Sequence, residues 1–421
     1  MFIKNYFLKR IQKLKKLFSK SQFKNRFFVL VITSFGLMFL SIPLCSFILF
    51  LNYVTWFFTL LFMVLSGIYV ICCCEVKIDL LFLSFPLFCI TAFISSVLSF
   101  FCSFVITPFA LAIISSYIYL ICKAEKKFIK WFYFVIQIAL IIFAFYFIYS
   151  YKEDFISLSF TRLGNKFGDE NDIAIFFSLG YFLSFYYIFT IKKIFAKLLY
   201  FASLCIFILC GFSTGSKTFL FLMMLTSVLT IFLFFGKKKL YISIIIVAIA
   251  GALFVLLLNL PVFSTMKDRF LTMFSTLTNK SIEGTNTSDM STIGRIQMFL
   301  NGLEMFFRKP MFGYGVNGFF VSSSYGGSWS HNHFSETLCS FGIIGTILYH
   351  VPFYYGLKGI FDKNKEKKKH IISIVLIFFF IMMMFSVALV SQKIYAYTIG
   401  IACAGLNPNT NYEKKVEILN A

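Results

Sequence analysis

The chain has 421 residues, of which 59% are hydrophobic, 21% are aromatic and only 13% are charged. This composition excludes a soluble globular domain and predicts an all-α polytopic membrane protein. The net charge of +22 does not indicate a nucleic-acid partner, because no patch of base-stacking aromatic residues accompanies exposed basic residues.

Apolar runs follow one another closely from Phe27 to Leu406. Runs of this length predict about twelve transmembrane helices, since about 20 residues cross the hydrocarbon core. We expect nine spans within residues 27–260 and three within 334–406, at about 334–357, 371–390 and 394–406. Their close spacing leaves no room for a separate soluble domain.

The segments before and after these spans are polar. Residues 1–26 are basic and place apolar residues at helical spacing, which predicts a cytosolic amphipathic helix on the inner leaflet. Residues 407–421 are expected to form a second cytosolic tail.

The charges divide by side of the membrane when each span crosses once. The inner segments hold 28 of the 39 Lys and Arg and 7 of the 17 Asp and Glu, a net of +21, and the outer segments carry a net of +1. Almost all of the positive excess therefore follows the positive-inside rule. The same topology places both termini in the cytosol.

Three outer segments are rich in polar residues. They are the loop 151–174, the short STGSK turn at 213–217, and the long extracytoplasmic loop 261–333. The third is too long for a simple connection, which indicates a function or a local fold.

An apolar stripe in the long loop predicts a helix on the membrane surface. Its residues are Ile296, Phe299, Leu300, Leu303 and Phe307. We expect this interfacial helix to have Ser291 or Thr292 as its N-cap and to end before Pro310.

The topology gathers Arg162, Lys217, Arg295 and His331 on the outer side, although they lie far apart in the sequence. Arginine suits a phosphate ligand because its planar guanidinium group donates two hydrogen bonds at once. Histidine is able to accept a proton near neutral pH, and His331 is the main candidate, with His333 beside it.

Simpler interpretations remain open for each of these residues. His331 could equally be a surface or capping residue. Arg295 could be an interfacial residue whose side chain extends to the lipid head groups, and Lys217 could be the ordinary lysine at the end of a span. Glu336 fits either a residue that orients the histidine ring or one that faces the lipid head groups.

Metal and disulfide chemistry are not expected. All 11 cysteines lie within or at the ends of spans, and the cluster Cys72, Cys73 and Cys74 lacks C-x-x-C spacing. No Asp-x-Asp sequence occurs in an outer loop to bind a divalent cation.

Several motifs resemble the O-antigen ligase and polymerase superfamily. His331 and Asn332 are followed by nine residues and then by Gly342, two residues and Gly345, which is similar to the histidine motif of O-antigen ligases. PMFGYGVNGF before the histidine, RLGNKFGDENDIA at 162–174 and STGSK at 213–217 resemble further family segments, with Lys217 where the family has arginine. The resemblance extends over residues 155–360.

This resemblance implies a fold similar to GT-C glycosyltransferases and an enzyme of the bacterial cytoplasmic membrane. The enzyme would transfer glycan from a polyprenyl diphosphate carrier to an acceptor sugar at the outer face, without a cofactor, metal or nucleotide sugar. His331 would deprotonate the acceptor hydroxyl, while Arg162 and Arg295 would bind the diphosphate, together with Lys217, whose point charge replaces the family's guanidinium fork. Asn171, Asn332, His333 and Glu336 are candidates for supporting positions around them.

We expect a polymerase that joins lipid-linked repeat units into capsule or O-antigen. A ligase that moves finished glycan to lipid A core is the alternative, and a flippase for lipid-linked units ranks third because the spans carry almost no ionisable residue. Partners would be the lipid-linked donor, the glycan acceptor and membrane lipids, with a flippase and a chain-length regulator as further candidates.

Overall fold

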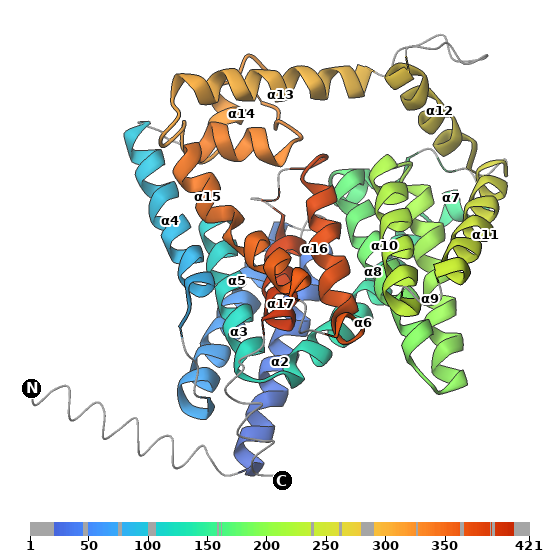
Figure 1. The fold of residues 1–421 in the computed structure, drawn as a ribbon, viewed down its shortest axis with the longest axis horizontal. Coiled ribbons are helices and arrows are strands. Elements are labelled where there is room, and N and C mark those ends of the chain that lie inside the picture. Colours follow the sequence, from blue (N-terminus) through green and yellow to red (C-terminus); the bar gives the residue numbers. More distant parts are fainter. Residues whose placement is uncertain are drawn as a thin grey trace, which may run out of the picture.

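The structure is a computed structural model. It describes residues 21–44, 49–74, 78–99, 107–157, 160, 162–236, 240–260, 263–278, 290–325, 327–362, 366–387, 389 and 392–407. All regular secondary structure in these residues is helical, which confirms the predicted fold class (Figure 1).

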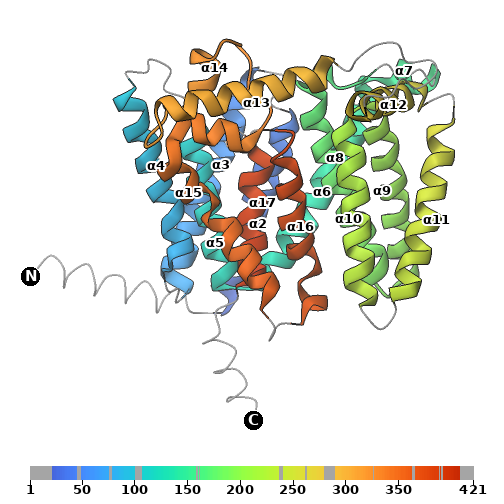
Figure 2. The same ribbon diagram turned by 45° about the horizontal axis from the view of Figure 1, so that its top comes forward.

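Long helices form a bundle that runs between two ends (Figure 2). They are α2 (Ser21–Leu44), α3 (Leu49–Cys73), α4 (Leu80–Leu98), α5 (Thr107–Ala124), α6 (Lys127–Ser150), α8 (Glu170–Thr190), α9 (Ile194–Ser213), α10 (Lys217–Phe235), α11 (Leu240–Leu258), α15 (His333–Phe361), α16 (Ile371–Met383) and α17 (Lys393–Leu406). Of the described helices, nine are long and apolar enough to cross a membrane, namely α2 to α6, α8 to α10 and α15. The protein is therefore a polytopic membrane protein, and the count of about twelve spans stays a prediction for α11, α16 and α17.

The remaining α-helices and one 3-10 turn gather at one end of the bundle, which we call the site end. They are α7 (Lys152–Ser157), η1 (Asn165–Phe167), α12 (Ser264–Thr278), α13 (Met290–Arg308) and α14 (Gly318–Ser322). The site end corresponds to the side that the sequence predicts to be outer. The turn η4 (Lys367–His370) belongs to the opposite end.

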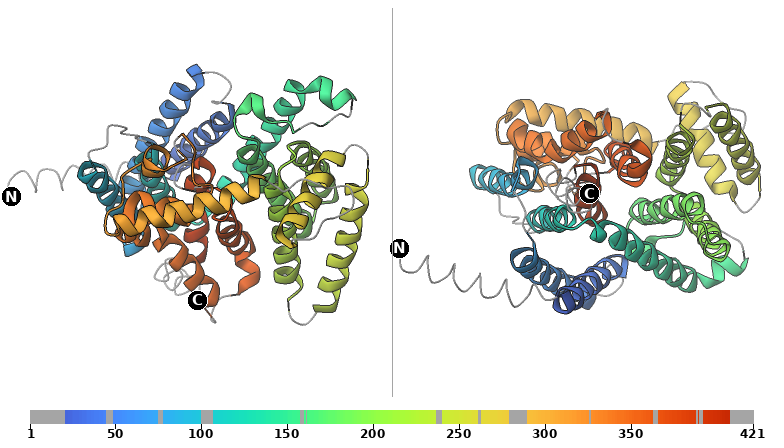
Figure 3. Two further views of the ribbon diagram at one scale, coloured as in Figure 1. Left: turned by 90° about the horizontal axis from the view of Figure 1, so that it is seen from above. Right: turned by 60° about the horizontal axis from the view of Figure 1, so that its bottom comes forward.

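The helix α13 lies across the site end, as the view from above shows (Figure 3). It packs on α15, where Gly302 approaches Ser335 closely. The predicted apolar stripe is on another face, since Ile296, Leu300 and Phe307 are 53–75% exposed. This exposed stripe fits the predicted interfacial helix, because it is available to the membrane surface.

One boundary in this region differs from the prediction, and one helix was not predicted. The N-cap predicted at Ser291 or Thr292 is wrong, because α13 begins at Met290 and both residues lie inside it. The helix ends at Arg308, before Pro310, as predicted. A further amphipathic helix, α12, was not predicted.

The last hairpin is shorter than expected. The helix α16 ends at Met383, whereas the apolar run predicts a span to about residue 390. At 1.5 Å per residue its 13 residues extend about 20 Å, less than the hydrocarbon core of about 30 Å. The predicted tails fall mostly outside the described residues, since α2 begins at Ser21 and the description ends at residue 407.

The helix α15 covers the predicted span at 334–357 and is interrupted within it at Gly342. Gly342 has φ 62° and ψ −168°, which separates His333–Phe341 from the longer part of the helix. The break frees carbonyl groups of the first part, and the PMFGYG segment pairs with them. The amides of Tyr314 and Gly315 donate to the carbonyls of Cys339 and Ser340 at 2.8 and 2.7 Å.

The partner segment also explains why residue 342 is glycine. The Ile343 amide donates to the Pro310 carbonyl at 2.8 Å, and a Cβ atom at residue 342 would lie 2.3 Å from the Met311 oxygen. The two glycine-containing motifs of the sequence are thus the two sides of one backbone contact. This contact attaches the first part of α15, which begins just after His331, to residues 310–315.

We expect Gly342→Ala to prevent this contact. The left-handed backbone and the overlap with Met311 together should cost about 2–5 kcal/mol. Purified protein in detergent should accumulate less and melt at a lower temperature. Gly251→Ala is the matched control, because a Cβ there meets nothing within 4 Å; equal melting of the two variants would contradict the role of the break.

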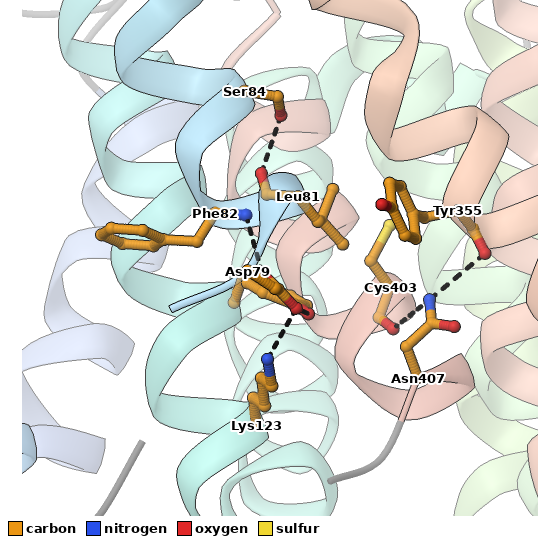
Figure 4. A network of polar contacts seen from close by, with 9 residues as sticks. Asp79, Leu81, Phe82, Ser84, Lys123, Tyr355, Cys403 and Asn407 are labelled. Atoms are coloured by element: carbon orange, nitrogen blue, oxygen red, sulfur yellow. Dashed lines mark hydrogen bonds and ion pairs between the residues drawn. The ribbon is translucent and has the colours of Figure 1, made fainter. Parts of the chain in front are cut away.

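A polar network holds the helices together at the end opposite the site (Figure 4). The Asp79 carboxylate accepts hydrogen bonds from Lys123 and Tyr119, both at 2.6 Å, and from the Phe82 amide at 2.9 Å. The Asn407 side chain donates to the Tyr355 carbonyl at 3.2 Å. The network joins α4 to α5 and α15 to the end of α17, so these helices are fixed far from the site.

Candidate active site

A cavity of about 190 Å³ opens at the site end between α10 and α16. Three cations line it, each from a different helix: Lys217 from α10, Arg269 from α12 and Arg295 from α13. The other lining residues are Asn171, Thr218, Phe221, Leu222, Met382, Phe385 and Ser386. No acidic residue is among them, so this cavity, which we call the α10–α16 cavity, is suited to an anionic ligand.

The turn before α10 positions two of these cations. Arg269 donates from Nη1 to the Gly215 carbonyl at 2.6 Å, which fixes α12 to the turn. The Ser216 hydroxyl donates to the Asn171 side chain at 2.8 Å, which fixes the same turn to α8. Lys217 begins α10 directly after this turn, so the predicted residues Lys217 and Asn171 lie at one cavity.

His331 does not line this cavity, but it lies within electrostatic reach of Arg295, which does. The side chain is half-buried. Burial, followed by the positive charge of Arg295, lowers the pKa of His331, while the negative charge of Asp169 opposes this shift. The neutral imidazole is therefore favoured, which is the form that accepts a proton.

Arg162 lies beside the cavity but does not line it. Its guanidinium group forms an ion pair with Glu170 at 3.2 Å, and its side chain is 41% exposed. The neighbouring Leu163 amide donates to the Ser213 carbonyl at 2.8 Å, which fastens this loop to the turn at 213–217. Arg162 and Arg269 both approach Gly215, since a Cβ there would lie 3.5 Å from atoms of each.

His333 is separated from His331 by the helix start, although only one residue lies between them. It is fully buried and packs against Tyr349 and His350, with ring centroids 4.8 and 5.1 Å apart. A buried imidazole is unable to reach an acceptor sugar, so His331 is the better candidate for the base. The expectation that the spans hold almost no ionisable group is incomplete, since His350 is in α15.

Asn332 and Glu336 shape the backbone around His331. The Asn332 side chain caps α15 by accepting from the amides of Phe334 and Ser335 at 3.0 and 3.2 Å. The buried Glu336 carboxylate accepts from the Ser330 amide at 3.2 Å. Glu336 therefore neither orients the ring directly nor faces the lipid head groups; it holds the residue before His331.

Backbone strain coincides with the predicted site residues. In the part of the chain that the structure describes, Arg162, Asn317 and His331 are the non-glycine residues with positive φ, at 66°, 61° and 51°. Such conformations cost about 1–3 kcal/mol each and cluster at functional sites. Two of the three are residues that the sequence selects for chemistry.

A comparison with protein families agrees with this geometry. The family model described as O-antigen ligase matches residues 201–350. The chain contains an O-antigen ligase family domain. The match covers 150 of the 421 residues, and no curated protein matches the chain.

The O-antigen ligase domain includes most of the site. Lys217, Arg269, Arg295 and His331 all lie within residues 201–350, whereas Arg162 and Asn171 precede them. This confirms the resemblance drawn from the histidine motif over residues 201–350 of this membrane protein. The roles of the individual residues stay predictions.

Sequence reasoning missed two contributors to the site of the O-antigen ligase domain. The sequence analysis gives Arg269 no role of its own. Its position on an amphipathic segment of the long loop was the signal that could have marked it as a candidate site residue. The end of α16 with Met382, and the turn after it with Phe385, gave no signal because this stretch is as apolar as an ordinary membrane span.

Asp169 offers a test of the electrostatic environment of His331. Asp169→Asn removes the negative charge and keeps an oxygen that can accept the Asn171 amide hydrogen bond of 2.7 Å. The pKa of His331 should fall further, and a base works only when deprotonated. The acid limb of kcat/KM against pH should therefore move to lower pH.

Glu153→Gln is the control for this shift, because Glu153 is an exposed carboxylate on α7. The control should leave the acid limb in place. A limb that moves to higher pH in Asp169→Asn would mean that His331 is not the titrating base.

Proposed function

We propose that the protein is a metal-independent glycosyltransferase that polymerises polyprenyl-diphosphate-linked repeat units at the outer face of the cytoplasmic membrane. The observation that carries the proposal is the α10–α16 cavity, which Lys217, Arg269 and Arg295 line together, with His331 within electrostatic reach of Arg295. A diphosphate is the anionic group that such a set of cations suits best.

The neutral imidazole of His331 and the three cations of the cavity suit one reaction, a direct displacement at the anomeric carbon of the donor. The neutral imidazole of His331 takes the proton of the acceptor hydroxyl as its oxygen attacks the anomeric carbon of the donor. The bond between this carbon and the diphosphate oxygen breaks, and the electron pair leaves with the diphosphate. Arg295, Arg269 and Lys217 stabilise the charge that develops there, and direct displacement inverts the anomeric configuration.

Arg162 has a supporting part in this proposal. Its ion pair with Glu170 already neutralises part of its charge, and it is not part of the cavity lining. We infer that it holds the loop beside the turn at 213–217 and contacts the diphosphate or the first sugar only when the donor is bound.

A ligase that transfers finished glycan to lipid A core is the second candidate. The family description and the His331 motif both favour it. Polymerase and ligase use the same type of donor and differ in their acceptor, so the cation cavity suits both.

Glycan analysis of a strain that lacks this protein separates the candidates. A polymerase is expected to leave single capped repeat units on the envelope, whereas a ligase would leave long unattached polymer. Repeat units that stay on the inner leaflet would indicate transport instead. Unchanged envelope polysaccharide would contradict the proposed function.

A further inference from the structure

Two aromatic rings pack together in the segment that leads to His331. Phe320 is in α14, which lies at the site end beside α13 (Figure 2), and Trp329 lies two residues before His331. The ring centroids of Phe320 and Trp329 are 5.2 Å apart, with an interplanar angle of 41°. Both side chains are half-buried, so each keeps part of its surface exposed. Neither ring has a part in the reaction proposed above.

Contacts on both sides hold this aromatic pair in place. The Gly327 amide donates to the Phe320 carbonyl at 2.9 Å, which closes the loop between the two rings. The preceding residue, Phe319, is fully buried in a cluster with residues of α13 and α15. Directly after the tryptophan, the Ser330 amide donates to the buried Glu336 carboxylate at 3.2 Å. A ligand would therefore meet a surface that is already formed, which lowers the entropic cost of binding.

The aromatic pair lies close to the candidate base. Two residues span at most about 7 Å of extended chain, so the backbones of Trp329 and His331 are no farther apart than that. This length is comparable with one sugar ring and its hydroxyl groups. A sugar that packs on the tryptophan would therefore bring a hydroxyl group toward the imidazole.

The surroundings of the pair suit a neutral glycan better than an anion. Residues 322–330, SSSYGGSWS, include five serines and no charged residue. The cations that line the α10–α16 cavity come from other elements, α10, α12 and α13. The C–H face of a sugar packs on the electron-rich face of an aromatic ring, while its hydroxyl groups form hydrogen bonds at the edges. The polar loop and the cation cavity thus suit different substrates.

We propose that the acceptor glycan binds with a sugar ring against Trp329 and Phe320, which presents one of its hydroxyl groups to His331. This inference rests on the proposed function, because it takes the acceptor to be a sugar. It separates recognition of the acceptor, by neutral aromatic residues, from recognition of the donor, by cations.

Tryptophan fluorescence tests this binding in the full-length protein. The chain has three tryptophans, and Trp56→Phe with Trp131→Phe leaves Trp329 as the only one. Both replaced residues are exposed on membrane-spanning helices. The probe is the repeat-unit oligosaccharide that mild acid releases from the lipid-linked glycan of the host. The emission of Trp329 should change saturably with this oligosaccharide, and Phe320→Leu should weaken the apparent affinity several-fold.

A second single-tryptophan protein is the matched control. It keeps Trp131 and has phenylalanine in place of Trp56 and Trp329, so its emission should not respond to the oligosaccharide. An unchanged emission of Trp329 would overturn the inference. Quenching of Trp329 by brominated lipid in vesicles, without a response to the oligosaccharide, would also overturn it, because the residue would then be an interfacial anchor.

Acceptor kinetics distinguish a binding residue from a structural one. Trp329→Leu should raise the KM for the acceptor several-fold and leave kcat and the KM for the donor unchanged. Trp329→Phe should recover most of the loss, because it keeps an aromatic face. Trp131→Leu is the control, since Trp131 is 47% exposed on α6. A lower kcat with an unchanged acceptor KM would indicate a structural role and contradict the inference.

Glycan transfer separates this inference from the proposed function. Transfer by the wild type, with no response of Trp329 and an unchanged acceptor KM in Trp329→Leu, would reject the binding place and keep the enzyme. A saturable response of Trp329 without any transfer by the wild type, supplied with lipid-linked glycan from the host membrane, would keep the binding place and reject the enzyme.

Discussion

His331→Ala should lower the rate of glycan transfer by about 10²–10⁴-fold, the usual contribution of a general base. The acceptor hydroxyl is not ionised at neutral pH, so its oxygen attacks slowly unless a base removes the proton. His331 is the candidate because it is half-buried beside Arg295 and its pKa is lowered, which keeps the imidazole neutral. Transfer measured with purified protein in vesicles gives the rate directly.

The variant should remain folded. Alanine removes the ring but keeps the two hydrogen bonds between the Ser330 hydroxyl and the Asn332 backbone that organise the segment. His370→Ala is the matched control, because it removes an imidazole at the opposite end of the bundle and should keep full activity. Normal transfer by His331→Ala would reject the assigned base, and equal loss in both variants would indicate a general effect on folding.

Arg295→Ala should lower kcat/KM for transfer by about 10²–10³-fold, as expected when one group that stabilises the leaving charge is removed. Arg295 lines the α10–α16 cavity and acts electrostatically on His331, so it links the donor to the base. Arg295→Lys should recover only part of the loss, because a point charge replaces a bidentate fork. Kinetics with purified protein and lipid-linked donor measure both effects.

The pH profile makes this prediction specific. The positive charge of Arg295 lowers the pKa of His331, so its removal should raise that pKa and move the acid limb of kcat/KM to higher pH. The shift is opposite in sign to that expected for Asp169→Asn. Arg308→Ala is the control on the same helix, since Arg308 is 66% exposed and pairs with Glu304. Full activity of Arg295→Lys would show that simple charge is sufficient.

The sequence by itself determined the class of the protein and predicted the side of the membrane on which its site lies. Long apolar runs can satisfy their backbone hydrogen bonds in lipid only as helices, so composition alone predicted the helical bundle. The uneven distribution of Lys and Arg among the loops predicted which loops are cytosolic. The family match confirmed the resemblance based on the histidine and glycine motifs. The interfacial helix from Arg295 was also predicted, since its apolar residues repeat with helical period.

Only the tertiary structure decided which of these residues meet. The cations Lys217, Arg269 and Arg295 come from separate helices, and their convergence at one cavity depends on how α10, α12, α13 and α16 pack. The break at Gly342 depends on the backbone of residues 310–315, which packs against this part of α15. The sequence near Gly342 alone does not show that contact. Local sequence determines the helices because hydrophobic burial and backbone hydrogen bonding act within each segment. The site depends on contacts between segments, which only packing establishes.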